Sequence, residues 1–264
     1  MEPKTVLVTG AAGGMGQAVC DRLARQGYTV YGLDLKGDPE RKIYAADLRD
    51  GASVRAAARQ IAEEAVRLDA VVHLAGIFDL DSLVEISEEA FLRILDINLC
   101  GVYRVNQAFL PLLRPGSRIV ITSSELAPLS PLPFTGIYGL TKTAVEQYAA
   151  ALRMELQLLG IHVCVLRPGA VSTGMLGVST GRLERFCAET RLYACNAARF
   201  RAITDRVESR SIPPEKLAGK VASILASRRP RLVVCVNRNP LLLLMSALPK
   251  RLQLFLIRKI LAPS

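Results

Sequence analysis

The stretch VTGAAGGMGQAV, residues 8–19, places a cluster of glycines between an apolar run and a segment with helical periodicity. The run TVLVT at 5–9 is short, apolar and rich in β-branched residues, which is typical of a buried strand. Glycines at such a junction allow a tight turn and let a phosphate group approach the backbone and the N-terminus of the following helix. The position of the cluster therefore predicts a dinucleotide-binding turn, whereas a glycine cluster alone would be weak evidence.

Short apolar runs alternate with helical segments along the rest of the chain. We predict strands at 5–9, 28–34, 42–47, 69–76, 117–124, 161–169 and 231–236, and helices at 14–27, 53–68, 87–113 (with Ser87 as N-cap), 137–159, 175–208 and 213–227. The predicted strands are apolar on both faces, which indicates a parallel sheet covered by helices on both sides. The predicted fold class is α/β, as a single doubly wound Rossmann-type domain whose parallel sheet has about seven strands.

The second predicted strand ends in Asp34. A carboxylate at that position can accept hydrogen bonds from both ribose hydroxyls of an adenosine and repels a 2′-phosphate. The glycine turn contains no arginine that would offset this repulsion, although Lys36 is close in sequence. The pattern favours NAD over NADP, and the alternative is that Asp34 is only a solvated strand-end acid.

The stretch YGLTK, residues 138–142, places a tyrosine four positions before a lysine on a predicted helix. That spacing brings both side chains to one face, about one turn apart. Taken alone, the pair is interpreted as structural, because Tyr and Lys meet at this spacing in many helices; the alternative is a phenol whose acidity is tuned by an ammonium group.

The glycine spacing G-x-x-x-G-x-G and YGLTK occur together with further fragments in a fixed order, and with them the chain resembles the short-chain dehydrogenase/reductase family from about residue 4 to 236. The matching positions are Thr9–Gly16, Asp34, Asp47, Leu48, Ala75, Gly76, Asn98–Gly101, Ser123, Ser124, Tyr138–Lys142 and Arg167–Thr173. The C-terminal extension is similar to that of the hydroxysteroid and retinol dehydrogenase branch.

The resemblance implies a catalytic set made of Asn98, Ser124, Tyr138 and Lys142. Tyr138 would exchange a proton with the substrate oxygen, Lys142 would lower the pKa of Tyr138 and hold the nicotinamide ribose, and Ser124 would bind the substrate oxygen. Asn98 would support a proton-relaying water. The loop before Tyr138 is one residue longer than the common spacing, so Ser124 is preferred to Ser123. The implied cofactor-binding residues are Thr9, Gly10, Gly14, Met15, Gly16, Asp34, Asp47, Leu48, Ala75, Gly76, Tyr138, Lys142, Pro168, Gly169, Val171 and Thr173, with Thr173 near the carboxamide.

The function that the resemblance implies is NAD(H)-dependent interconversion of a secondary alcohol and a ketone, on an apolar, steroid-like or lipid-like small molecule. The alternatives are a non-catalytic dinucleotide-binding sensor or scaffold, and a reductase of an acyl or sugar carbonyl. A sugar-nucleotide epimerase would need a different glycine spacing and a longer C-terminal domain. The expected organisation is an NAD-binding domain at 1–236, with a mobile substrate lid at 174–212, and a basic apolar extension at 237–264.

Three features depart from the family pattern. Leu74 replaces an asparagine that usually braces the sheet. Only about eight residues separate Asp34 from the third predicted strand, so we expect a bare loop instead of a second helix. His73 is expected to be a core or strand-end residue.

The excess positive charge is confined to the end of the chain. The formal net charge is +10, and residues 216–264 hold ten basic side chains and no acidic one. This segment lacks interleaved aromatic residues, so we expect no nucleic-acid binding and consider an anionic membrane surface or an acidic substrate. From Pro249 we predict a short amphipathic helix with one apolar and one basic side; the apolar side is Leu252, Phe255, Leu256 and Ile260, and the basic side is Arg251, Arg258 and Lys259. The alternatives are packing of the extension on the core or on a second subunit, and peripheral membrane contact.

The six cysteines are scattered and show no metal-ligand spacing, so we expect reduced thiols, mostly in the core, and no metal site. A strand begins too early for a signal peptide, which gives an expectation of a cytoplasmic protein, with possible membrane association. A homodimer or homotetramer is the expected assembly.

Overall fold

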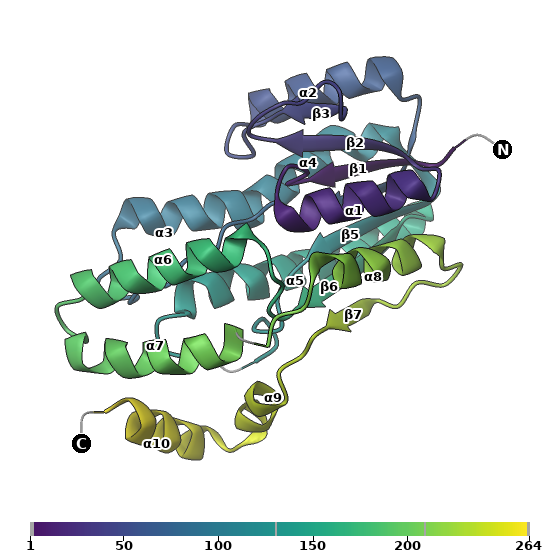
Figure 1. Ribbon diagram of the computed structural model, residues 1–264. Helices are drawn as coiled ribbons and strands as arrows, with labels where there is room; N and C mark the ends of the chain where they lie inside the picture. The colour runs from purple at the N-terminus through teal and green to yellow at the C-terminus, as the bar shows by residue number, and fades with distance from the viewer. Residues whose placement is uncertain (1–2, 130, 209, 263–264) are drawn as a thin grey trace.

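A computed structural model describes residues 3–129, 131–208 and 210–262, and it contains a parallel sheet with helices on both faces (Figure 1). The strands are β1 (Thr5–Thr9), β2 (Thr29–Asp34), β3 (Ile43–Ala45), β4 (Leu68–His73), β5 (Leu113–Thr122), β6 (His162–Pro168) and β7 (Val233–Val236). The helices are α1 (Gly14–Arg25), α2 (Gly51–Glu64), α3 (Glu88–Leu95), α4 (Gly101–Phe109), α5 (Gly136–Leu156), α6 (Gly174–Glu189), α7 (Ala194–Glu208), α8 (Pro214–Ala226), α9 (Pro240–Ala247) and α10 (Lys250–Leu261).

In the described residues the sheet has seven strands in the order β3-β2-β1-β4-β5-β6-β7, and each adjacent pair is parallel. The chain order reverses between β1 and β4, so the carboxyl ends of these two strands flank the crevice at which such sheets bind ligands. The predicted doubly wound α/β class is confirmed.

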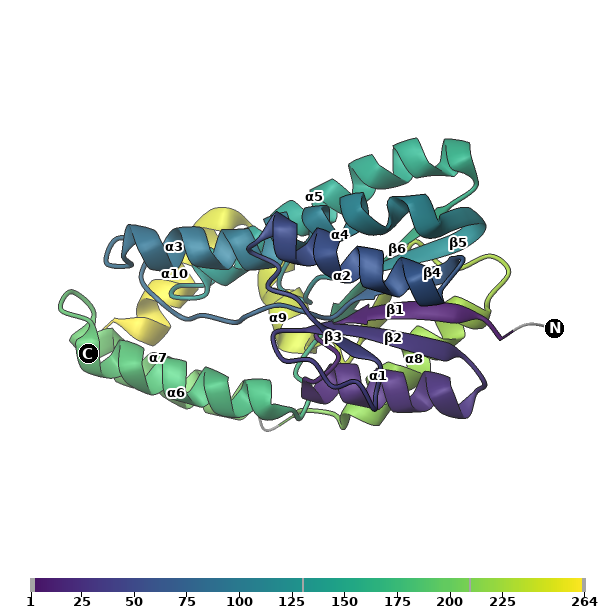
Figure 2. The ribbon, with the colours of Figure 1, turned by 90° about the horizontal axis from the view of Figure 1, so that it is seen from above.

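Two hydrophobic cores cover the two faces of the sheet. Successive side chains of a strand point to opposite faces, so Leu7 of β1 packs beneath α2, α4 and α5, while its neighbours Val6 and Val8 pack beneath α1 and α8. Figures 1 and 2 show these two helical layers on either side of the sheet. Burial on both faces explains why the strands are apolar throughout.

The helix predicted at 87–113 is confirmed as one continuous helical stretch, but it is not α-helical throughout. Ser87 does cap its start, by accepting a hydrogen bond from the Ala90 amide at 3.2 Å. After α3, however, the chain forms a π-helical turn at Asp96–Cys100 before α4 begins, and a 3-10 turn at Leu110–Leu112 follows α4. A π turn contains an extra residue and is frequent at functional sites; here it carries Asn98 into the interior.

The other predicted strands and helices are present within a few residues of their predicted limits, with two exceptions. β5 begins four residues earlier than predicted, at Leu113, and the segment predicted as helical at 175–208 forms two helices, α6 and α7. In the described chain, the link between β2 and β3 is a loop without a helix, as expected. All six cysteines are free thiols, but only Cys164 is buried, so the expectation that most lie in the core is wrong.

Helices α6, α7, α9 and α10 lie at one end of the sheet, and together we call them the helical cover (Figure 1). α6 and α7 form a helical pair, and α10 packs beside α7 (Figure 1). A third hydrophobic cluster joins them, with Phe134 in contact with the rings of Phe186 and Phe200, and with Leu261 of α10 in the same cluster. No helix in the described part of the chain is long and apolar enough to cross a bilayer.

The predicted division of α10 into an apolar and a basic side is wrong. Gln253 and Leu261 are buried, whereas Leu252, Leu254 and Phe255 are exposed. The packing surfaces of α7 and α9 determine which side of α10 is buried, and the sequence of α10 alone does not contain this information.

Candidate active site

In the turn between β1 and α1, the backbone at Gly16 lies close to the backbone at Gly10. Gly10 has φ of +69°, in the left-handed region that favours glycine. A Cβ on Gly16 would lie 2.0 Å from the Gly10 carbonyl oxygen, so no larger residue fits there. The turn therefore leaves α1 with an open N-terminus that faces the crevice, the arrangement that binds phosphate groups.

A cleft of about 650 Å³ begins at this turn and runs along the carboxyl ends of β1, β2 and β4. Ten of the residues assigned to the cofactor line it: Gly10, Gly14, Met15, Gly16, Asp34, Asp47, Leu48, Ala75, Gly76 and Thr173. A second cavity of about 230 Å³ adjoins it, and Met15, Gly76 and Thr173 line both. The second cavity contains the other assigned residues Tyr138, Lys142, Pro168, Gly169 and Val171, and also Ser124.

Thr9 and Asn98 line neither cavity. The buried hydroxyl of Thr9 accepts hydrogen bonds from the amides of Leu74 and Ala75, at 3.2 and 3.1 Å. This contact braces the end of β4 against β1, at the place where Leu74 replaces the expected asparagine. Thr9 thus shapes the floor of the cleft from beneath.

The carboxylate of Asp34 is oriented by two backbone amides. Its two oxygens accept hydrogen bonds from Ala12 at 2.9 Å and from Leu35 at 2.8 Å. Arg49 also lines the cleft, and its guanidinium is held by Asp47, with Nη2 at 2.7 Å from Oδ2. The hydrogen bond from Arg49 lowers the pKa of Asp47. A glycine turn, an open helix N-terminus and an oriented carboxylate fit a dinucleotide.

Tyr138 and Ser124 meet in the second cavity. Tyr138 lies on α5, and Ser124 lies in the loop that follows β5. Burial raises the pKa of Tyr138 to about 12, and a hydrogen bond with Ser124 opposes that shift. The ring of Phe78 packs edge-on against Tyr138, with centroids 4.7 Å apart, and excludes water from one side of the phenol. Ser123 is directed elsewhere, because its hydroxyl donates to the Lys142 carbonyl at 3.2 Å.

Lys142 is also buried, one turn further along α5. Its Nζ lies 5.7 Å from the centroid of the Tyr138 ring and donates to the Thr122 carbonyl at 3.2 Å. Burial lowers the pKa of Lys142 to about 8. The expected lowering of the Tyr138 pKa by Lys142 is not seen in this geometry, since burial dominates at both groups.

Asn98 fixes the loop that separates the two cavities. Its side-chain amide exchanges two hydrogen bonds with the backbone of Ile77, both at 2.9 Å, and donates to Thr141 at 3.1 Å. A Cβ on Gly76 would lie 3.1 Å from Asn98 Oδ1 and 3.5 Å from Lys142 Nζ, so these groups are close neighbours. The π turn thus places Asn98 against the Lys142 side of the site.

His73 has no part in either cavity. It ends β4, is buried, and shares a hydrogen bond of 2.9 Å between Nε2 and Asn106, while Asn106 donates to Tyr148. Burial lowers the pKa of His73 to about 4, which keeps the ring neutral. The expectation of a core residue at a strand end is confirmed.

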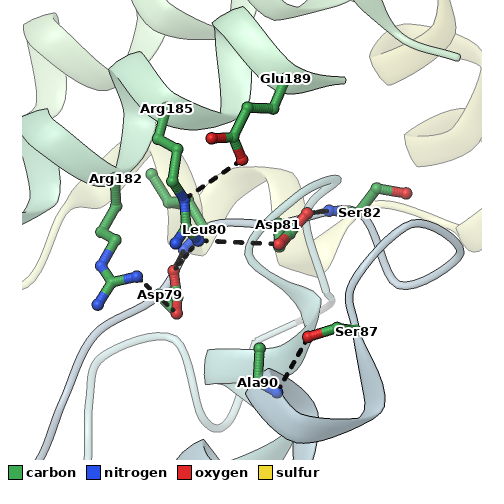
Figure 3. Close-up of polar contacts among 9 residues, drawn as sticks. All are labelled: Asp79, Leu80, Asp81, Ser82, Ser87, Ala90, Arg182, Arg185 and Glu189. Atoms are coloured by element: carbon green, nitrogen blue, oxygen red, sulfur yellow. Dashed lines mark hydrogen bonds and ion pairs between the residues drawn. The ribbon is translucent and has the colours of Figure 1, made fainter. Parts of the chain in front are cut away.

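A cluster of ion pairs joins α6 to the loop after β4, and sequence analysis missed it (Figure 3). Arg182 and Arg185 point from α6 toward the buried carboxylate of Asp79, each with a nitrogen 3.5 Å from one of its oxygens. Arg185 also reaches Asp81 at 3.9 Å. Arg182 also lines the larger cleft, so this cluster connects the helical cover to that cleft. The pairs join residues about a hundred positions apart, and nothing in their local sequence signals them.

The wall of the smaller cavity is largely apolar and comes from distant parts of the chain. Its apolar lining includes Phe78, Leu80, Leu126, Leu132, Phe200, Ile203 and Leu242. Glu125, also missed from the sequence, lines it too, and burial raises the pKa of this carboxyl. Glu125 accepts a hydrogen bond of 2.6 Å from the Asn239 amide and so ties the Ser124 loop to the start of α9.

The fold and this crevice fit the binding of a dinucleotide. The family model described as short chain dehydrogenase matches residues 4–182, and the chain belongs to that family.

Similar proteins agree with this assignment. A 3-ketodihydrosphingosine reductase of Bacteroides thetaiotaomicron is 30% identical over 234 residues, which cover 87% of this chain and 86% of that protein. The human 17-beta-hydroxysteroid dehydrogenase type 1 is 31% identical over 215 residues, with coverages of 73% and 64%. Among solved structures, a short-chain dehydrogenase from Streptomyces avermitilis shares the fold with a TM-score of 0.76 at 24% identity, over 89% of this chain and 88% of that one.

Proposed function

We propose that the protein is an NAD(H)-dependent oxidoreductase that interconverts a secondary alcohol and a ketone on an apolar substrate. The observation that carries the proposal is the position of Ser124, Tyr138 and Lys142, which share a mostly apolar cavity that opens onto the dinucleotide cleft. A protein that only sensed a dinucleotide would need the cleft but not this catalytic set.

A bound nicotinamide dinucleotide supplies the hydride acceptor or donor. In reduction, the Tyr138 hydroxyl donates a proton to the carbonyl oxygen of the substrate, while the Ser124 hydroxyl hydrogen-bonds the same oxygen and holds it in place. Phe78 and the apolar wall exclude water, which strengthens both hydrogen bonds. The ammonium group of Lys142 stabilises the negative charge that develops on the phenol as the proton leaves.

The protonation states at neutral pH suit the proton donation that reduction requires. With a pKa of about 12, Tyr138 holds its proton at neutral pH and is ready to donate it. With a pKa of about 8, Lys142 is still charged at neutral pH. Oxidation would require the phenolate, which burial disfavours in this structure.

NAD(H) is proposed over NADP(H) because of Asp34. Its carboxylate is fixed at the cleft by two amides and would repel a 2′-phosphate. Arg49 lines the same cleft and could offset the repulsion, but its guanidinium is paired with Asp47. The preference for NAD(H) therefore depends on the ion pair between Arg49 and Asp47 staying formed.

The apolar lining supports a lipid-like or steroid-like substrate over a sugar. Polyhydroxylated molecules lose hydrogen bonds to water that an apolar wall cannot replace. The similar proteins named for a ketosphingoid and a hydroxysteroid substrate support the same class.

The test is a spectrophotometric assay at 340 nm with NADH and with NADPH, on a ketosphingoid base, a ketosteroid, an acyl ketone and a ketose. The proposal predicts turnover of the apolar ketones, with higher kcat/KM for NADH. Turnover of the ketose alone would contradict the substrate class. Tight NADH binding without turnover of any carbonyl would favour the alternative function, a non-catalytic dinucleotide sensor.

A further inference from the structure

The outer face of α10 combines large apolar and basic side chains, and we call it the basic apolar face. It consists of Arg251, Leu252, Leu254, Phe255, Arg258 and Lys259. All six are exposed, and the exposed fractions of Leu254 and Phe255 are 68% and 59%. Positions 251, 254, 255 and 258 follow the three- and four-residue spacing that puts side chains on one side of a helix.

The helix that carries this face is anchored to the protein by its other side. Leu261 and Ile257 belong to the hydrophobic cluster with Phe134 and Phe200. The buried Gln253 donates to the carbonyls of Ser246 and Leu248, at 3.1 and 2.6 Å, and so fixes the turn between α9 and α10. The basic apolar face is therefore a fixed surface of the folded protein.

The positive charge of the basic apolar face favours an anionic binding partner. No acidic residue follows Glu215 in the chain, and the segment 216–264 holds ten basic side chains. A symmetric dimer through this face would put it against its own copy, so Arg251, Arg258 and Lys259 would face like charges. Apolar side chains interleaved with cations instead suit the boundary between acyl chains and anionic headgroups.

We propose that the basic apolar face docks on the surface of a bilayer that contains anionic lipid. Phe255 and the two leucines enter the boundary between headgroups and acyl chains, and the three cations contact the headgroups. The helix before it, α9, contributes Leu242 to the wall of the smaller cavity, so the docked helix is connected directly to the site. The proposal goes beyond the proposed reaction and does not depend on it.

The test is co-sedimentation of the full-length protein with vesicles of phosphatidylcholine, with or without about a third of phosphatidylserine. Arg251→Gln/Arg258→Gln removes two charges from the face, and Leu254→Ser/Phe255→Ser removes two apolar groups. The matched controls are Arg55→Gln/Arg59→Gln on α2, on the far edge of the molecule in Figure 1, and Leu158→Ser/Leu159→Ser after α5. Circular dichroism and gel filtration establish that each variant is folded.

Wild type and both controls are expected to bind the anionic vesicles, and each face variant to bind them about tenfold more weakly. Binding should also weaken at about 1 M salt, where the Debye length falls to about 3 Å. Equal losses in the face and control variants, or no vesicle binding by wild type, overturn the proposal. A wild-type dimer that Leu254→Ser/Phe255→Ser converts to monomer, without vesicle binding, would assign the face to a second copy instead. Because no turnover is measured, failure here is distinct from failure of the proposed reaction.

Discussion

The crevice of the sheet and its helical cover are built in different ways. In the crevice, the polar groups of Thr9, Asp34 and Asn98 are each held by backbone atoms, within a sheet buried on both faces. The cover formed by α6, α7, α9 and α10 is attached by a small aromatic cluster and by ion pairs, and it exposes apolar side chains. From this difference we infer that the crevice determines which reaction is catalysed and that the cover determines substrate specificity.

The largest expected effect comes from removing one oxygen in the crevice. Tyr138→Phe should lower kcat by about 10²–10⁴-fold, the range expected for a general acid, while NADH binding stays nearly unchanged. The measurement is steady-state kinetics with NADH fluorescence titration. Tyr148→Phe on the same helix is the matched control, since its hydroxyl bonds Asn106 outside both cavities. More than about a tenth of the wild-type rate in Tyr138→Phe would refute the assigned role.

The next effect is the pH dependence of ketone reduction. Because the pKa of Lys142 is lowered to about 8, its ammonium loses its proton as pH rises through that value. The rate should then fall, approaching tenfold per pH unit above about 8. A profile of kcat/KM from pH 6 to 10 measures it, and a flat profile would contradict the role of Lys142.

Unfolding should not mimic this loss of activity. Between about pH 8 and the unfolded pKa of 10.5, folded Lys142 binds fewer protons than unfolded Lys142, so its contribution to the free energy of unfolding increases with pH. The thermal melting temperature recorded over the same range is the control.

Cofactor preference should respond to Asp34. Asp34→Ser removes the repulsion of a 2′-phosphate, and the ratio of kcat/KM for NADH over NADPH should fall about tenfold. Glu40 is exposed in the loop that follows Asp34, and Glu40→Ser should leave the ratio unchanged. A wild-type preference for NADPH would mean that Arg49 or Lys36 outweighs the carboxylate.

The smallest expected effect concerns the ion pairs that connect the crevice to the cover. Asp79→Asn leaves Arg182 and Arg185 without their shared carboxylate, so KM for an apolar ketone should rise several-fold with little change in kcat. Limited proteolysis within α6 and α7 should also become faster. Glu184→Gln, also on α6, breaks an exposed pair with Arg201 of α7 and should change neither. Equal proteolysis rates in the two variants would show that the cluster does not hold the cover.

The sequence predicts the crevice well and the cover poorly, for physical reasons. The strands and the glycine turn are encoded locally, by apolar runs and by glycines between them. The π turn at Asn98 depends on a bond to Ile77, and the cluster at Asp79 depends on α6, so neither has a local signal. The packed side of α10 likewise depends on α7.

The most direct test of the central claim is the dependence of kcat/KM on chain length in a series of methyl ketones reduced with NADH. We expect kcat/KM to increase about threefold to fourfold with each added methylene until the apolar cavity is filled, because burying one methylene contributes about 0.8 kcal/mol. Values that stay flat or fall with chain length would contradict an apolar substrate site beneath the cover.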